Sequence, residues 1–169
     1  MGPHQMSATE HLRPAIPSDA DAISNVYLRS FEWAYRDGIV RLAHSHDEVR
    51  QWVGSIVIPT HHVTVAVDDE AILGYTATLP GWLQHLYVEP LHIRSGVGTR
   101  LLKQVMTEQP TGFDLWTFTE NTRARAFYEH HGLAAIEFGD GSTNEEGRPD
   151  VRYRWCHRAD AGSDNSNPA

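Results

Sequence analysis

Cysteine and long apolar runs are almost missing from this sequence. Its single cysteine, Cys156, excludes an internal disulfide, and no motif of a cysteine nucleophile surrounds it. No stretch approaches the roughly 18 consecutive apolar residues that a membrane-spanning helix requires. The N-terminus also lacks the basic-then-apolar order of a secretion signal. We therefore expect a soluble, cytoplasmic protein without a membrane partner.

Positive charge is in deficit, because 14 Lys and Arg face 22 Asp and Glu, for a net charge of −8. The basic residues are scattered, so the overall field repels nucleic acid and argues against a DNA or RNA partner. Histidine is abundant, but His61-His62 and His130-His131 are adjacent pairs whose side chains diverge, and no carboxylate lies at ligand spacing. The sequence predicts no metal site.

The chain is long enough for one domain with a core that needs no disulfide. Residues 1–6, MGPHQM, resemble a cloning or protease scar and are excluded from the fold. Residues 159–169 are rich in Ser, Asn, Asp and Gly, which predicts a disordered tail. We expect a single domain over residues 7–158.

A tight glycine turn between an apolar strand and an amphipathic helix is the first feature that indicates a ligand. Residues 86–90, LYVEP, are followed by residues 93–102, IRSGVGTRLL. A helix start leaves backbone N–H groups without partners, and glycines remove the Cβ atoms that would block close approach. This turn is therefore expected to bind an anion such as phosphate.

Two common phosphate loops do not fit this turn. A Walker loop needs a Lys followed by Ser or Thr after its last glycine, whereas Gly98 is followed by Thr99-Arg100. A dinucleotide fingerprint needs a third glycine or alanine three residues after Gly98, where Leu101 stands. A turn that merely packs a helix onto a sheet stays open as the structural alternative.

A second motif follows one strand later, at residues 121–133, NTRARAFYEHHGL. In a helix that starts at Asn121, the side chains of Ala124, Phe127 and Tyr128 share one face, because spacings of three and four residues stack. The ordered pair of motifs, LYVxP with xxGxG and then NxxAxxFYxxxG[FL], resembles the acetyl-CoA-binding signature of the GCN5-related N-acetyltransferase (GNAT) superfamily. One departure is Ile93, where that family often has Gln or Arg.

The hydrophobic periods along the rest of the chain fit this resemblance. Period-two segments predict strands and period-3.6 segments predict helices. Helices are expected after the Ser18-Asp19 cap and after the capping box Ser45 to Glu48, where Pro59 is expected to end the helix. The expected strands are residues 12–15, 62–67, 72–79, 82–88, 113–118, 134–138 and 151–156. This is the GNAT order β-α-α-β-β-β-α-β-α-β-β, an α/β (α+β) fold with a mixed, mostly antiparallel central sheet flanked by helices.

The resemblance implies acetyl-CoA as co-substrate and assigns its binding residues. The strand backbone at Leu86, Tyr87 and Val88 would hold the pantetheine arm, and the turn amides from Arg94 to Thr99 would cradle the pyrophosphate. Asn121 also suits a helix N-cap, and Phe127 also suits the core. The full expected set is Leu86, Tyr87, Val88, Arg94, Ser95, Gly96, Val97, Gly98, Thr99, Asn121, Ala124, Phe127 and Tyr128.

The implied chemistry is attack of a neutral amine on the acetyl carbonyl, with an acid that protonates the departing sulfur. The resemblance places the hydroxyl of Tyr128 beside that sulfur. The positions that often supply a base on the fourth strand are Trp82 and Gln84 here, and neither can serve. His85 points to the other face by strict alternation, unless a bulge re-aims it. The base candidates elsewhere are Glu32, His44, His46 and Glu120, beside a relay through water.

Acceptor choice in this fold depends on the segment after the first helix and on the last hairpin. Trp33 and Tyr35 would form an apolar or cation-binding wall, or part of the core. Gln84 and Glu145 would also face the acceptor, with Glu145 binding an ammonium group.

The sequence thus predicts an N-acetyltransferase that acts on a primary amine of a small molecule. Acetylation of a protein or peptide amine, or a non-catalytic acyl-CoA-sensing domain, stays open as an alternative. So does a homodimer in place of a monomer.

Overall fold

A computed structural model of the chain describes residues 10–157. The predictions for residues 1–6 and 159–169 lie outside this range. The helices are α1 (Ala20–Ala34), α2 (His46–Trp52), α3 (Ile58–Thr60), α4 (Val97–Glu108) and α5 (Thr122–His130). The strands are β1 (His11–Pro14), β2 (His62–Asp68), β3 (Ala71–Leu79), β4 (Trp82–Val88), β5 (Phe113–Phe118), β6 (Ala134–Gly139) and β7 (Asp150–Trp155).

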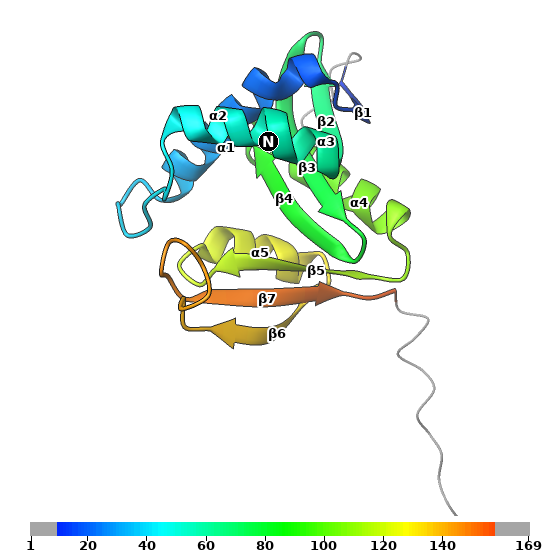
Figure 1. The fold of residues 1–169 in the computed structure, drawn as a ribbon. Coiled ribbons are helices and arrows are strands. Elements are labelled where there is room, and N and C mark those ends of the chain that lie inside the picture. The colour runs from blue at the N-terminus through cyan, green and yellow to red at the C-terminus, as the bar shows by residue number, and fades with distance from the viewer. Residues whose placement is uncertain (1–9, 158–169) are drawn as a thin grey trace, which may run out of the picture.

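The strands form one mixed sheet in the order β1-β2-β3-β4-β5-β7-β6 (Figure 1). All neighbouring pairs of the described strands are antiparallel except β4 with β5. The predicted order and fold class are confirmed, and each predicted strand starts within one residue of the observed one.

The sheet is split at its middle, between β4 and β5. These two strands pair only at Trp82 and Asp114, and the amide of Asp114 donates to the carbonyl of Gly81 at 2.9 Å. Beyond this point the strands diverge, as Figure 1 shows, so that β1–β4 and β5–β7 form the two arms of a V. Backbone groups along β4 are therefore not used in pairing with β5.

Asp114 also fixes the arm β5–β7 at this junction. Its side chain is 8% exposed, and its two oxygens accept hydrogen bonds from Arg152 and Arg154 on β7. Hydrogen bonds from Arg154 and then Arg152 hold the pKa of this carboxyl below its ordinary value of 3.8.

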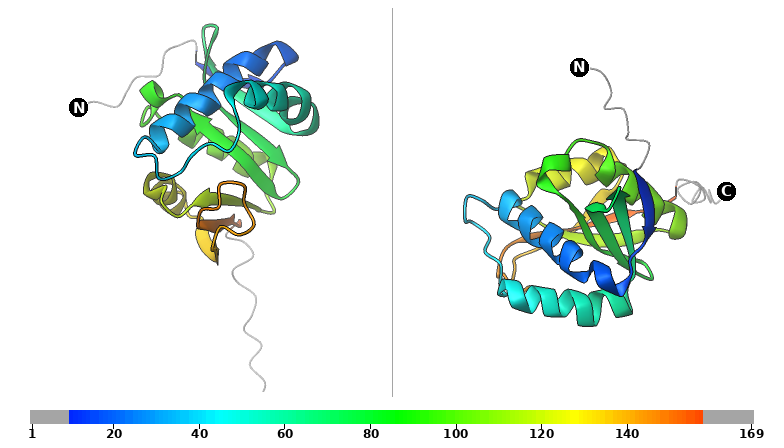
Figure 2. Two further views of the ribbon diagram at one scale, coloured as in Figure 1. Left: turned by 60° about the vertical axis from the view of Figure 1, so that its left-hand side comes forward. Right: turned by 90° about the horizontal axis from the view of Figure 1, so that it is seen from above.

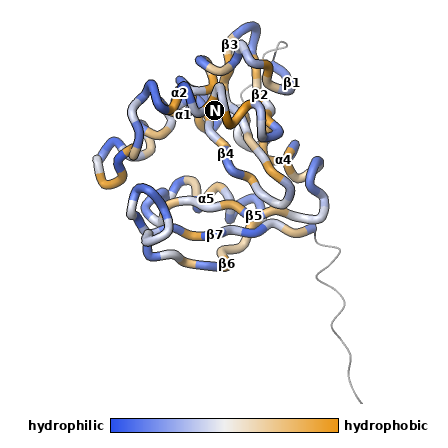
Figure 3. Tube along the Cα trace, in the orientation of Figure 1, coloured by the Kyte–Doolittle hydropathy of each residue, from blue (hydrophilic) through white to orange (hydrophobic). Residues whose placement is uncertain are grey.

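The helices cover opposite faces of the sheet (Figure 2). On one face, α1 and α2 bury residues such as Ile23 and Val49 against β2 and β3. On the other face, Val97 and Leu101 of α4 pack on Ala66 and Leu73. Tyr128 of α5 packs with Leu133 and with residues of β5 and β7. In Figure 3 the apolar residues are most prominent in β2 and β3, whereas the loop between β6 and β7 is mostly hydrophilic.

Two helix boundaries differ from the sequence prediction. Asp19 does not cap α1 with its side chain, because its carboxylate accepts the amide of Ile16 and pairs with Arg13 at 2.7 Å. A short 3-10 turn, Pro17–Asp19, leads into the helix instead. Pro59 does not end the second helical segment, which runs through a π-helical turn, Val53–Val57, into α3.

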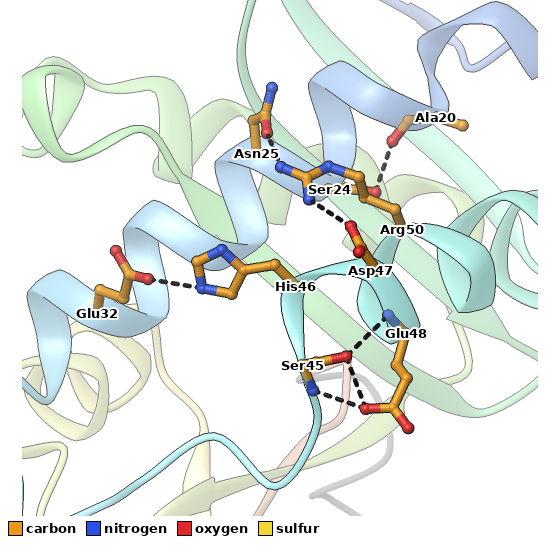
Figure 4. A network of polar contacts seen from close by, with 9 residues as sticks. All are labelled: Ala20, Ser24, Asn25, Glu32, Ser45, His46, Asp47, Glu48 and Arg50. Carbon is orange, nitrogen blue, oxygen red and sulfur yellow. Dashed lines mark hydrogen bonds and ion pairs between the residues drawn. The ribbon is translucent and has the colours of Figure 1, made fainter.

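The predicted capping box at the start of α2 is present. The amide of Glu48 donates to the Ser45 hydroxyl, and the Glu48 carboxylate accepts the Ser45 amide at 2.7 Å (Figure 4). None of the helices within residues 10–157 is both long and apolar enough to span a membrane.

Candidate functional site

A cleft with a volume of about 1050 Å³ lies where the two arms of the sheet diverge. Its lining comes from α1, β4, β5, the turn before α4, α5 and the loop between β6 and β7. The two motifs that the sequence singled out therefore border one cavity.

The glycine turn forms one end of this cleft. Gly96 has a φ of 92°, a conformation that favours glycine, and it precedes the first residue of α4. The amides of Val97, Gly98 and Thr99 belong to the first helical turn and have no intrahelical acceptor. A Cβ on Gly98 would lie 3.5 Å from Val88 and from the ring of Phe127, so the glycine keeps this part of the cleft open.

Ser95 departs from the expected cradle. Its amide and its hydroxyl both donate to the carbonyl of His92, at 3.2 Å and 2.6 Å, and the residue does not line the cleft. Val97 is 1% exposed, because its side chain belongs to the core under α4. Arg94, Gly96, Gly98 and Thr99 line the cleft.

The helix α5 brings its predicted residues to the cleft. Asn121 is the N-cap, since its side-chain oxygen accepts the amide of Ala124 at 3.0 Å. Its side-chain nitrogen donates to the hydroxyl of Tyr35 at 3.2 Å, which links α5 to the end of α1. Ala124, Phe127 and Tyr128 follow along the lining. Burial raises the pKa of Tyr128 above its ordinary value, so its hydroxyl stays protonated at neutral pH.

The strand β4 carries a bulge that decides where its side chains point. Leu83 pairs with Thr78 and His85 pairs with Ala77, so Gln84 is the extra residue. The bulge turns His85 to the face covered by α1, away from the face of Leu83. Gln84 lines the cleft, as do Leu86, Tyr87 and Val88.

His85 lies outside the cleft lining and is 8% exposed. Its Nδ1 lies 2.9 Å from the hydroxyl of Tyr75, and the rings of Tyr27, Trp52 and Tyr87 surround it. Burial lowers the pKa of His85 to about 3. Such a buried, weakly basic ring is suited to packing, and the geometry does not favour it as the base.

The end of the cleft where the sequence analysis expects an acceptor, called the acceptor end below, is formed by α1, β5 and the loop between β6 and β7. Trp33 and Tyr35 both line it, and the guanidinium of Arg123 lies 4.4 Å from the Trp33 ring. Glu145 does not line the cleft, because its carboxylate turns outward to Nε2 of His44 at 2.6 Å. The neighbouring residue Glu146 lines the cleft instead of Glu145.

The other base candidates are engaged in ion pairs. His46 lies 3.0 Å from Glu32, as Figure 4 shows, and Glu120 pairs with Arg148. None of these residues lines the cleft. No group of three or more potential metal ligands was found in residues 10–157.

The sequence analysis missed several lining residues. Trp116 and Phe118 face the cleft from β5, and Asp150 does so from β7. Leu115 and Thr117 of the same strand line the cleft as well, so alternation within β5 does not distinguish the lining residues. The cavity depends on the divergence of β4 and β5, for which the sequence carries no local signal.

Comparison with known proteins agrees with this architecture. Three solved structures with a similar fold are YjaB from Escherichia coli, the PaiA N-acetyltransferase from Thermoplasma acidophilum and YncA, a putative acetyltransferase from Salmonella typhimurium. Their TM-scores against this chain are 0.71, 0.67 and 0.66. They are 18%, 19% and 16% identical to this chain and cover 88%, 90% and 93% of it. The alignments cover 98%, 100% and 99% of those chains. At these identities the likeness defines the fold, which is that of the acetyltransferases.

The sequence itself matches the model of the acetyltransferase (GNAT) domain over residues 59–132. This segment contains the first motif, the second motif up to Gly132, and the strands between which the cleft opens. Residues 59–132 thus match the GNAT superfamily, which agrees with the fold that the solved structures define. A comparison with curated proteins gave no significant match.

Proposed function

We propose that this protein transfers the acetyl group of acetyl-CoA to a primary amine of a small molecule, with Tyr128 as the general acid. The observation that carries the proposal is the common cleft: the anion-binding start of α4 and the buried, protonated Tyr128 of α5 line the same cavity. An acyl donor that carries a thioester at one end and phosphates at the other can contact Tyr128 and the start of α4 at the same time only if both border one cavity.

The cleft also fits the donor in other respects. The Thermoplasma structure is a complex with coenzyme A, and the Salmonella structure contains acetyl-CoA as its cofactor. In this chain, Gly98 leaves room for a phosphate group above the first turn of α4. The backbone of β4 at Leu86 to Val88 is unpaired toward β5 and can orient an amide-containing arm.

Acetyl-CoA supplies a thioester that an amine can attack. The residues of this chain would hold the phosphates, orient the arm along β4 and donate the Tyr128 proton to the departing sulfur. The amine must lose its own proton. Neither Gln84 nor Trp82 can accept it, so we assign this step to a water molecule held among the polar groups of the cleft.

The test is thiol release from acetyl-CoA, followed with a thiol reagent over a panel of amines. Tyr128→Phe should lower kcat by about a hundredfold or more, the usual contribution of a general acid, while the affinity for acetyl-CoA changes little. Tyr75→Phe is the matched control, because it removes a buried hydroxyl that does not line the cleft.

Equal rates for Tyr128→Phe and Tyr75→Phe would refute the acid role of Tyr128. Binding of acetyl-CoA without amine-dependent thiol release would instead support an acyl-CoA-sensing domain. The cytoplasmic location, the single domain over residues 7–158 and the homodimer stay predictions.

A further inference from the structure

Three buried side-chain atoms among residues 10–157 have no hydrogen-bond partner, and all three lie near the start of β7, where only Asp150 lines the cleft. They are Oε2 of Glu120, Nε of Arg148 and Oδ1 of Asp150. The strands β5 and β7 bring them together, since Phe118 pairs with Asp150 and the amide of Thr119 donates to Pro149 at 2.9 Å. Glu120 and Arg148 already pair with each other through other atoms. Because buried polar groups are nearly always paired, the unpaired oxygen of Asp150 indicates a place where a polar ligand belongs.

Asp150 is the member of this group that borders the cavity. It is 8% exposed and lines the cleft at the first position of β7. Its Oδ2 accepts a hydrogen bond from Asn144 at 3.0 Å, whereas Oδ1 is buried without a partner. A Cβ on Gly139 would lie 2.0 Å from Oδ1, so only glycine at that position allows this carboxylate orientation.

The loop that holds Asp150 is organised without a ligand. The side-chain nitrogen of Asn144 donates to the carbonyl of Arg148 at 2.8 Å, and its oxygen accepts the Arg148 amide at 3.1 Å. Gly141 and Gly147 have positive φ, and a Cβ on Gly141 would lie 2.6 Å from the backbone of Arg148. The unpaired oxygen of Asp150 is thus held in position, as a binding group requires.

Glu146 adds a second negative charge to the same lining. Burial, and to a lesser extent the charge of Glu146, raises the pKa of Tyr27 and of Tyr35 to about 12. None of the ion pairs found within residues 10–157 involves Glu146. Arg148, the basic residue of this loop, is already paired with Glu120 and does not line the cleft.

Two aromatic residues connect the surroundings of Asp150 with the start of α5. The ring of Tyr35 lies 5.7 Å from that of Phe118, and its hydroxyl accepts the hydrogen bond from Asn121 at the start of α5. Phe118 is the strand partner of Asp150. A cation beside Asp150 would lie near these rings, whose faces themselves attract cations. Tyr128 lies seven residues beyond Asn121 along α5.

We infer that the acceptor end, through Asp150 and Glu146, binds a second cationic group of the substrate, so that the preferred acceptor is a primary amine carrying another ammonium group across an alkyl spacer. This inference rests on the proposed function for the reaction at the first amine. The binding of the second charge is a property of the cleft itself and can be measured separately.

The test compares α,ω-diaminoalkanes with amino alcohols of the same chain length, which retain the reacting amine and a polar end but lack the second charge. Binding to the protein in the presence of coenzyme A is measured by calorimetry, and kcat/KM by thiol release from acetyl-CoA. The diamine should be favoured by about tenfold or more in both, as expected for a hydrogen-bonded charge.

Asp150→Asn and Glu146→Gln should each reduce the ratio of the diamine value to the amino-alcohol value severalfold. Asp140→Asn is the matched control, because it makes the same change in the same loop outside the cleft lining. Melting curves verify that each variant folds. If Asp150→Asn does not fold, the diamine preference of Glu146→Gln decides the test.

Equal binding of diamine and amino alcohol, or a preference that survives in both cleft variants, would overturn the inference even if amines are acetylated. A diamine preference in binding without thiol release from any amine would retain the cation site and refute the proposed acetyl transfer.

Discussion

Asp114 lies at the point where the two arms of the sheet meet, and its replacement should show how much this junction contributes to stability. Asp114→Asn retains the shape of the side chain and removes the charge that Arg152 and Arg154 share. Four guanidinium N–H groups reach the two oxygens, with distances of 2.7 to 2.9 Å for three of them. The carboxylate is buried, but the side chains of Arg152 and Arg154 are 25% and 48% exposed.

The magnitude follows from this partial exposure. A hydrogen bond to a charged group contributes about 1.5–3 kcal/mol when buried, and solvent screening reduces that value for the exposed arginines. Because asparagine still accepts through one oxygen, we expect a loss of about 2 kcal/mol in the free energy of unfolding. For a domain of this size that corresponds to a decrease of roughly 4–8 °C in Tm.

Urea denaturation followed by tryptophan fluorescence measures this loss, with Glu137→Gln as the control. Glu137 bonds the same Arg152 at 3.2 Å but is 54% exposed, so its replacement should cost less than about 0.5 kcal/mol. The reasoning is refuted if Asp114→Asn costs no more than Glu137→Gln.

Three further outcomes are expected. The pKa of Asp114 is lowered in the folded protein, so the contribution of its charge to stability is complete above about pH 4 and disappears as the pH falls through the lowered pKa. The difference in unfolding free energy between wild type and Asp114→Asn, measured by urea titration, should therefore vanish in acid and stay constant near neutrality. Gly98→Ala should leave Tm unchanged or raised, because the added methyl group makes ordinary contacts at 3.5 Å in a helix. It should nevertheless weaken the binding of coenzyme A by about tenfold in calorimetry, and an unchanged affinity would contradict the phosphate cradle. Asn121→Ala should cost about 1 kcal/mol in urea unfolding through loss of the N-cap, whereas Asn121→Asp should recover most of it, since a carboxylate also accepts the Ala124 amide.

The elements of this fold could be predicted because each has a local signal. The capping box at Ser45 and the change from period 3.6 to period 2 at His62 depend on neighbours in the sequence, and both predictions are confirmed. The bulge at Gln84 could not be placed in this way, because it depends on how β4 pairs with β3. Strict alternation would have put His85 on the same face as Leu83.

The site was less predictable than the fold, since its polar contacts join distant parts of the chain. Asp114 and Arg152 are 38 residues apart, and nothing local indicates their pairing. The irregular loop after β6 has no period that would distinguish Glu146, which faces the cleft, from Glu145, which turns to His44. The role of Asp150 could not be predicted either, because its oxygen Oδ1 is buried without a partner only when β5, β6 and β7 are assembled.

The two hydrogen bonds of Asn121 have a consequence for ligand affinity. One amide group both starts the helix that faces the donor and holds Tyr35 of the acceptor wall. A displacement of Tyr35 by an acceptor must therefore act on the start of α5. Thermodynamic linkage makes this coupling reciprocal: whatever factor the acceptor imposes on the dissociation constant of the donor, the donor imposes on that of the acceptor.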